Sequence, residues 1–121
     1  MNCLEVVRAD KQTGYSISIR NAIDYMRHNY SHSDLTIDII ANQVGFSSGR
    51  LSVLFKQEVG QTVNKFLTDI RIEMAISLLE NSQCKIYEIA EMVGYKSSQY
   101  FSQIFCRSTG RRPIDYRKIP D

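Results

Sequence analysis

The sequence of 121 residues lacks any run of 18 or more apolar residues, so it contains no segment expected to cross a membrane. Its first residues, MNCLEVVRADK, lack the apolar stretch of a secretory signal, which predicts a cytoplasmic protein. The three cysteines, Cys3, Cys84 and Cys106, form no C-x-x-C pair and have no histidine at ligand spacing. We therefore expect no disulfide framework, no metal site and no cofactor.

No segment alternates between apolar and polar residues with the period of a half-buried strand. Apolar residues recur instead at helical spacing, and this pattern predicts an all-α fold of about seven helices. The first helix is expected over about residues 17–29, with Ser16 as its N-cap, and the last over residues 113–116. Residues 1–15 show no period and are expected to form a tail or a linker.

The chain contains an internal repeat. Residues 37–46, IDIIANQVGF, align with residues 86–95, IYEIAEMVGY, and five of these ten positions are identical. After one inserted residue, Lys96, the serines, the phenylalanine and the final glycine of residues 47–60 recur over residues 97–110. Two copies are too few to stack into a repeat array. The repeat therefore predicts two equivalent helical modules.

Each copy has the pattern of a short helix, a glycine turn and a second helix. Gly45 and Gly94 follow the short helices, where a left-handed turn favours glycine. Ser47 and Ser97 are suited to cap the second helices. This is the layout of a helix-turn-helix, whose second helix enters the major groove of DNA. One such hairpin is common as a packing unit, but two copies in one chain favour DNA binding.

A long helix is expected between the modules, from Thr62 to about Asn81. Its predicted inward stripe consists of Phe66, Leu67, Ile70, Met74 and Leu78. The predicted organisation is a first module over residues 16–61, a linker helix over 62–81 and a second module over 82–118. Such a linker is about 27 Å long at roughly 1.5 Å per residue, so we expect one monomer to bind one asymmetric DNA site.

Positive charge gathers in the second half of each repeat. Three basic residues and one acidic residue give residues 45–65 a charge of +2, and six basic residues and one acidic residue give residues 95–118 a charge of +5. Residues 1–44 carry −1 and residues 66–94 carry −3. Because local charge steers a polyanion, this distribution indicates double-stranded DNA as the partner. Charge on a solvated helical surface is the alternative interpretation.

The outward faces of the two second helices supply the candidate DNA-contacting residues. The candidates for base contact are Gly49, Arg50, Ser52, Val53, Ser98, Gln99, Ser102 and Gln103. The candidates for phosphate contact are Ser47, Lys56, Lys96, Ser97, Arg107, Arg111 and Arg112. Gln99 and Gln103, one turn apart, can each offer an amide to adenine and are the main candidates for direct readout. Arg50 suits guanine or a phosphate, whereas Val53 can only pack on a thymine methyl group.

Three stretches of the chain resemble the DNA-binding domain of the AraC/XylS family of bacterial transcriptional regulators, across about residues 16–118. They are IANQVGFSSGRLSVLFKQEVG (40–60), RIEMAISLL (71–79) and KIYEIAEMVGYKSSQYFSQIFCRSTGRRPIDYRK (85–118). The resemblance implies two helix-turn-helix modules, joined by a long helix, that bind successive major-groove segments. It also implies action at promoters on the nucleoid, with RNA polymerase as a further partner.

Residues 21–30, NAIDYMRHNY, resemble the response-regulator members of this family, which carry a receiver domain before the DNA-binding part. We therefore expect the chain to be either a short stand-alone regulator or, in preference, the C-terminal part of a longer protein. The intact protein is then expected to be able to dimerise.

Two other functional classes are compatible with parts of the sequence. Some proteins with this type of domain transfer alkyl groups to a cysteine, which would make Cys84 or Cys106 a nucleophile and His28 or His32 its base. No alkyl-acceptor motif surrounds either cysteine, so we expect the protein not to be an enzyme. The remaining alternative is a helical protein-interaction module that does not bind DNA.

Overall fold

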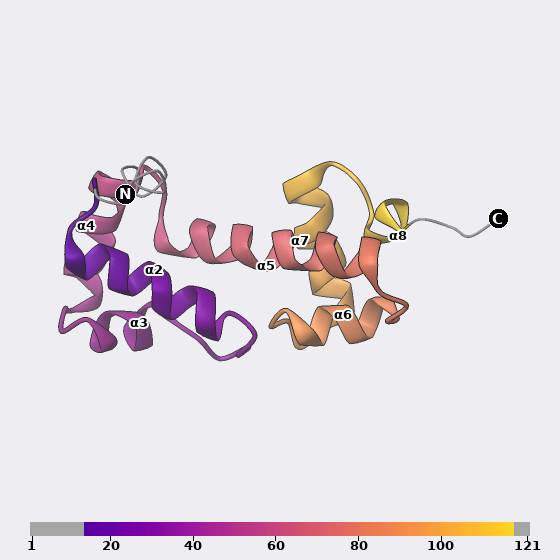
Figure 1. Cartoon of the computed structure of the whole chain (residues 1–121), viewed down its shortest axis with the longest axis horizontal. Helices are drawn as coiled ribbons and strands as arrows, with labels where there is room; N and C mark the ends of the chain where they lie inside the picture. The colour runs from indigo at the N-terminus through magenta and orange to yellow at the C-terminus, as the bar shows by residue number, and fades with distance from the viewer. Residues whose placement is uncertain (1–13, 118–121) are drawn as a thin grey trace, which may run out of the picture. The chain divides into compact units, whose positions relative to one another are not determined.

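The computed structural model describes residues 14–117, and the fold of this part of the chain is all-α (Figure 1). Its seven helices are α2 (Ile17–Asn29), α3 (Ile37–Gln43), α4 (Ser48–Val59), α5 (Val63–Asn81), α6 (Ile86–Met92), α7 (Ser98–Thr109) and α8 (Pro113–Tyr116). The predicted fold class and the bounds of the first and last helices are confirmed. Cys3, most of the predicted tail and residue 118 lie outside the described residues. None of the helices in residues 14–117 has the length and hydrophobicity needed to span a bilayer.

The chain divides into two compact units, each built around one copy of the repeat. Of the described residues, unit 1 comprises residues 14–28 together with Thr36–Phe66. Unit 2 comprises Asn29–Leu35 and residues 67–117. The first turn of α5 therefore belongs to unit 1 and the rest of α5 to unit 2.

The core of unit 1 is formed by apolar residues of α2, α3 and α4. Its most deeply buried side chains are Ile19, Ala22, Met26, Ile40, Ala41, Leu51 and Phe55. Phe55 also meets Phe66 edge to face, with ring centroids 5.4 Å apart. Ser16 caps α2, because its Oγ accepts a hydrogen bond from Ile19 N at 3.5 Å. Its backbone N–H and its hydroxyl both donate to the carboxylate of Glu58, which fixes the start of α2 to the end of α4.

The core of unit 2 is formed by α5, α6 and α7 and is covered at one end by α8. It contains Ile72, Ala75, Leu79, Ile89, Ala90, Val93, Tyr95, Phe101 and Phe105. The rings of Phe101 and Phe105 lie 5.7 Å apart, and Phe105 meets Tyr116 of α8 at 5.2 Å. Pro113 begins α8, where its missing N–H leaves no helical hydrogen bond unmade.

The repeat in the sequence is a repeat in the structure. Gly45 and Gly94 adopt φ angles of +77° and +103°, as the left-handed turns require. Phe46 and Tyr95, which follow them, each donate a backbone N–H to the carbonyl five residues earlier at 2.9 Å. Both modules therefore leave the short helix in the same way, and the second module reaches its capping serine one residue later because of Lys96.

The buried face of α5 differs from the predicted stripe. Leu67 and Ile70 are buried as predicted, but Met74 is 38% exposed and Leu78 is only half-buried. The positions next to them, Ala75 and Leu79, are buried instead, and Ile72 is buried as well. These three side chains pack in the core of unit 2 against α6 and α7, which are distant in sequence. In the second half of α5 the predicted stripe therefore lies one residue away from the buried face.

One charged side chain is buried in unit 2. The Nε of Arg71 donates to the carbonyl oxygen of Tyr30, and its terminal NH2 donates to that of His32, both at 2.9 Å. The guanidinium lies over the ring of Tyr95, 5.3 Å from its centroid. Burial lowers the pKa of Arg71, although an arginine keeps its charge at any ordinary pH. We call these contacts the Arg71 clamp. They hold residues 29–35 against the rest of unit 2.

Gly94 lies against this clamp. A Cβ at Gly94 would overlap the carbonyl oxygen of Tyr30 and would lie 2.8 Å from Nε of Arg71. Its counterpart in the first module, Gly45, has no atom within 4 Å of the corresponding Cβ position. The two equivalent turns therefore tolerate a side chain to different extents.

We predict that Gly94→Ala destabilises the protein more than Gly45→Ala does. Both changes place a Cβ on left-handed backbone, at a cost of about 1–2 kcal/mol. Gly94→Ala must also displace the Tyr30 carbonyl or the Arg71 side chain, which adds about 1–3 kcal/mol. Urea denaturation followed by circular dichroism measures both free energies of unfolding. Equal losses would contradict the close approach at Gly94.

Candidate nucleic-acid interface

The second helix of each module begins at a serine cap. Ser47 Oγ accepts a hydrogen bond from Arg50 N at 3.2 Å, and Ser97 Oγ accepts one from Tyr100 N at 3.1 Å. Each cap satisfies one of the free amides at the helix N-terminus. The hydroxyl hydrogen of each serine can still donate outward, which is compatible with the predicted phosphate contacts.

The structure brings the predicted base-contacting residues together on one helix of each unit. The residues on α4 are Gly49, Arg50, Ser52 and Val53, and those on α7 are Ser98, Gln99, Ser102 and Gln103. Ser102 is half-buried, and the others are exposed. The predicted phosphate contacts, all exposed, are Ser47, Lys56, Lys96, Ser97, Arg107, Arg111 and Arg112. The inward residues of the two helices are buried, so both outer faces are available to a partner.

Two side-chain contacts order the first turn of α4. The guanidinium carbon of Arg50 lies 4.8 Å from the centroid of the Phe46 ring, in a cation–π contact. The hydroxyl of Ser48 donates to Oδ1 of Asp38, which joins α4 to the first turn of α3. A guanidinium stacked by its face keeps its N–H edge available for the O6 and N7 atoms of guanine.

Gly49 has no packing reason to be glycine. A Cβ there would meet no atom within 4 Å, and its φ lies outside the left-handed region. Within a helix, glycine costs about 1 kcal/mol relative to alanine. Two explanations remain: a close approach of the DNA backbone, or a cost that the fold tolerates.

The outer face of α7 offers amides in place of a guanidinium. Gln99 and Gln103 are exposed one turn apart. Tyr100 lies on the same helix, is 54% exposed, and meets the Tyr95 ring at a centroid distance of 5.9 Å and an angle of 64°. Tyr100 was not among the predicted contacts. The repeat contained the signal, because Tyr100 is the counterpart of Arg50 at the offset of 50 residues.

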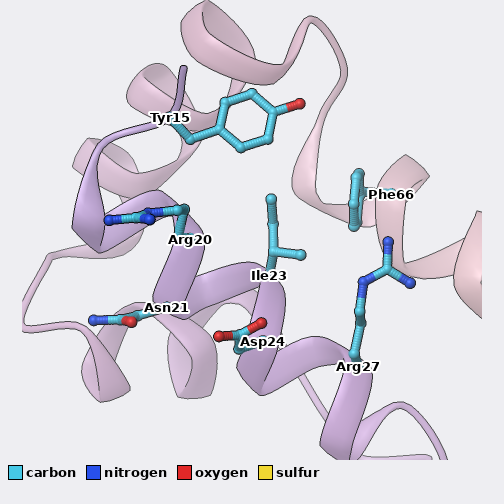
Figure 2. Close-up of a pocket in the computed structure, with 7 residues that line it drawn as sticks. All are labelled: Tyr15, Arg20, Asn21, Ile23, Asp24, Arg27 and Phe66. Carbon is cyan, nitrogen blue, oxygen red and sulfur yellow. The ribbon is translucent and has the colours of Figure 1, made fainter. Parts of the chain in front are cut away.

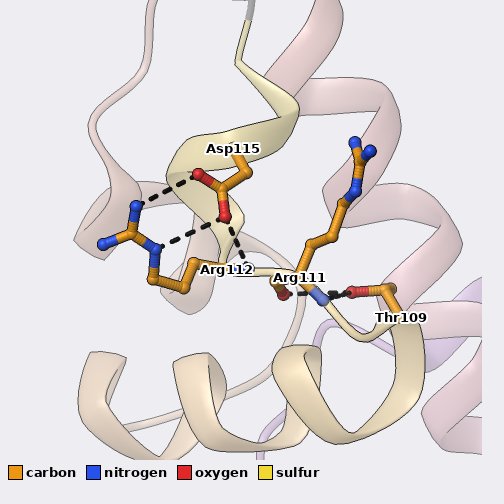
Figure 3. A network of polar contacts seen from close by, with 4 residues as sticks. All are labelled: Thr109, Arg111, Arg112 and Asp115. Atoms are coloured by element: carbon orange, nitrogen blue, oxygen red, sulfur yellow. Dashed lines mark hydrogen bonds and ion pairs between the residues drawn. The ribbon is translucent and has the colours of Figure 1, made fainter.

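The end of α7 and the start of α8 carry exposed arginines (Figure 3). Arg112 binds Asp115 with its side chain, at 3.1 Å and 3.4 Å, and with its backbone N–H at 3.1 Å. These hydrogen bonds from Arg112 lower the pKa of Asp115. The side chain of Arg112 is 71% exposed, and an ion pair in water is weak. The guanidinium can therefore exchange Asp115 for a phosphate at little cost.

The turn before Arg112 is held by Thr109. Its Oγ1 accepts a hydrogen bond from Arg111 N at 3.1 Å and donates to the carbonyl of Phe105 at 2.9 Å. The side chain of Arg111 points away from Asp115 in Figure 3, and its guanidinium carbon lies 5.8 Å from the centroid of the Tyr116 ring. The two neighbouring arginines are thus directed differently.

Unit 1 also contains a cavity of about 520 Å³ (Figure 2). Its walls include Tyr15, Ile23 and Phe66, with Arg20, Asp24 and Arg27 as charged groups. The guanidinium carbon of Arg27 lies 5.8 Å from the centroid of the Phe66 ring. None of the predicted DNA-contacting residues lines this cavity, so it has no part in the predicted base contacts.

Two cysteines and two histidines are among the described residues. Cys84 and Cys106 are half-buried free thiols in unit 2. Nδ1 of His28, in unit 1, pairs with the carbonyl of Asp24 one turn earlier at 2.8 Å. The carbonyl of His32 accepts from Arg71. Residues 14–117 contain no group of three or more His, Cys, Asp and Glu side chains that could hold a metal ion.

Comparison with known proteins finds relatives by sequence and by structure. Residues 40–119 match the family of the helix-turn-helix domain. The xylose operon regulatory protein of Escherichia coli K12 is 33% identical over 102 residues, which are 84% of this chain and 26% of that protein. The chain therefore spans about a quarter of the length of that regulator.

Two solved structures resemble this chain along most of their own length. The C-terminal domain of AraT, a response regulator from Geobacillus stearothermophilus, is 38% identical with a TM-score of 0.84, covering 88% of this chain and 89% of that one. The C-terminal domain of the two-component response regulator yesN from Fusobacterium nucleatum is 32% identical with a TM-score of 0.78. That match covers 80% of this chain and 94% of the other.

We predict that Gly49→Ala raises the free energy of unfolding by about 0.5–1 kcal/mol, because alanine is the better helix former and the space is open. Gly45→Ala, in the same unit but on left-handed backbone, is the matched control and should lower it. Urea denaturation measures both. A destabilised Gly49→Ala would contradict the open space at this position. If DNA approaches Gly49 closely, the same variant binds DNA more weakly although it is more stable.

Proposed function

The chain belongs to the AraC/XylS family of helix-turn-helix transcriptional regulators, and we propose that it binds specific double-stranded DNA through α4 and α7. The observation that carries this proposal is the repeated geometry of the two units. Each presents a serine-capped second helix with an exposed polar face and basic side chains nearby. In a helix-turn-helix the N-terminal residues of this helix contact the base edges.

The two helices are proposed to contact different bases. On α7, the amides of Gln99 and Gln103 can each pair with N6 and N7 of an adenine. On α4, Arg50 can pair with a guanine and Val53 can pack against a thymine methyl group. One good bidentate contact contributes about 1–3 kcal/mol of discrimination against a wrong base. Two unequal faces favour an asymmetric site bound by one monomer.

The basic residues around these helices are proposed to bind phosphates. Lys56 lies on α4 and Arg107 lies on α7, whereas Lys96, Arg111 and Arg112 flank α7. Phosphate contacts position a protein on the duplex and supply affinity, but they carry no sequence information. Sequence preference should therefore not depend on these basic residues.

The wider role is proposed from the relatives. AraT and yesN are response regulators whose C-terminal domains match this chain. This supports a role as the DNA-binding part of a regulator, with residues 16–61 and 82–118 as its modules and 62–81 as the linker helix. We further propose that it acts without catalysis at promoters on the cytoplasmic nucleoid. There it would contact RNA polymerase, and a longer form would dimerise.

We predict that binding of the full chain to a specific duplex weakens steeply with salt. Each neutralised phosphate releases about 0.9 counterion, so about five contacts give a slope of log affinity against log salt near −4 to −5. Fluorescence anisotropy over a series of potassium chloride concentrations measures this slope. An affinity that does not change between low and moderate salt would contradict DNA binding through these basic residues.

We predict that base contacts and phosphate contacts can be separated by two substitutions. Gln103→Ala should cost about 1–3 kcal/mol on the specific duplex and relax the preference at one base pair. Arg112→Ala should weaken binding to specific and unrelated DNA alike. Competition assays over a series of base-substituted duplexes measure both. An unchanged preference at every position in Gln103→Ala would remove Gln103 from the base-contacting set.

A further inference from the structure

We propose that the aromatic residue after each glycine turn, Phe46 or Tyr95, positions the side chain of Arg50 or Tyr100 for contact with a base. Tyr100 is then a specificity-determining residue that corresponds in unit 2 to Arg50 in unit 1. This inference rests on the proposed function, since it assigns roles within the same DNA-contacting faces. The evidence is that this contact occurs in both units, as a cation–π contact in unit 1 and as a contact between two aromatic rings in unit 2.

The backbone hydrogen bonds around the contact are the same in both units, although Lys96 adds one residue between Tyr95 and Ser97. Phe46 and Tyr95 are each fixed by a 2.9 Å hydrogen bond from their own N–H to the end of the preceding short helix. Arg50 and Tyr100 are each fixed by an N–H bond to the capping serine, at 3.2 Å and 3.1 Å. Each pair therefore joins the residue after the turn to the third residue of the second helix.

The side chains that meet in this frame differ. In unit 1 the Arg50 guanidinium stacks on the Phe46 ring at 4.8 Å. In unit 2 the Tyr100 ring packs edge to face on Tyr95 at 5.9 Å. The supporting rings are half-buried and buried, respectively, whereas Arg50 and Tyr100 are exposed. A fixed ring thus lies beneath a solvent-facing side chain in both units.

This arrangement reduces the side-chain conformational entropy that is lost when DNA binds. A long exposed side chain loses rotamer freedom when it becomes ordered against a base, which weakens the complex. A side chain already held on a ring loses less. Arg50 and Tyr100 both remain exposed while they make these contacts, so the guanidinium N–H groups and the phenol hydroxyl can still bind a partner.

The chemistry of Tyr100 suits a base edge. Its hydroxyl can both donate and accept a hydrogen bond, and Tyr100 stands on α7 with the exposed residues Gln99 and Gln103. A single hydrogen bond of this kind changes affinity by about two- to tenfold. We expect this effect at one base pair of the site.

A double-mutant cycle on the full chain tests Phe46. The probe is a duplex selected by the wild-type chain from a randomised pool. Phe46→Leu should weaken binding about two- to fivefold, the size of an exposed cation–π contact, and should have no further effect in Arg50→Ala. Phe46→Tyr, which keeps an aromatic ring, should bind like wild type. An equal loss from Phe46→Leu in both backgrounds would show a purely structural role and overturn the proposal for Phe46.

Nuclear magnetic resonance without DNA provides an independent readout. The side-chain resonances of Arg50 should be displaced upfield by the Phe46 ring current, and Phe46→Leu should abolish this displacement. Identical Arg50 resonances in the two proteins would overturn the positioning role whether or not DNA binds. A wild-type chain that selects no duplex would instead overturn the proposed function, and the base-contacting roles of Arg50 and Tyr100 with it.

Tyr100→Phe tests the second module, because it removes only the hydroxyl and keeps the ring contact. We expect a two- to tenfold weaker complex and a relaxed preference at one base pair, measured by sequencing duplexes selected from the same pool. Tyr87→Phe removes the hydroxyl of an exposed tyrosine on α6 and is the matched control, with no expected change in preference. A Tyr100→Phe chain that selects the wild-type sequence would overturn the assignment of Tyr100.

Discussion

The buried guanidinium of Arg71 is the interaction on which unit 2 depends most. It donates hydrogen bonds to two backbone carbonyls and lies over the ring of Tyr95. Losing it would remove the donor of the Tyr30 carbonyl, at a cost of up to about 1–3 kcal/mol for a polar group left unpaired, whereas the His32 carbonyl would keep its hydrogen bond from Leu35 N. Tyr95 in turn packs against Phe101 and Tyr100. The clamp thereby connects residues 29–35 to the helix proposed to contact DNA.

In unit 1 the second helix is held by weaker interactions, which are hydrogen bonds between exposed groups. Glu58 binds both polar groups of Ser16, and Asp38 accepts a hydrogen bond from the first turn of α4. Such bonds on exposed groups each contribute only about 0.5–1.5 kcal/mol. The two modules have similar backbones but different supports and different outer faces. This fits the proposal that each contacts different bases.

Much of the candidate site could be predicted from the sequence, because its determinants are local. Gly45 and Gly94 were placed at left-handed turns, and Ser47 and Ser97 at helix caps, since both features depend on a few neighbouring residues. The exposure of the predicted contacts followed from helical periodicity. Tyr100 was missed because an aromatic residue next to the core residue Phe101 is easily taken for a core residue itself. Its exposure is visible only in the folded structure.

The sequence by itself determined the all-α class, the helix bounds, the two turns and the separation of charge, because short-range propensity and local composition decide all of these. Only the tertiary structure decided which face of α5 is buried and which groups Arg71 contacts. Both outcomes depend on residues far apart in the chain: Ala75 and Leu79 pack against α6 and α7, and Arg71 bonds to carbonyls about forty residues earlier. No periodicity within one helix encodes such partners, since the free energy of burial depends on which surfaces meet after the chain has folded.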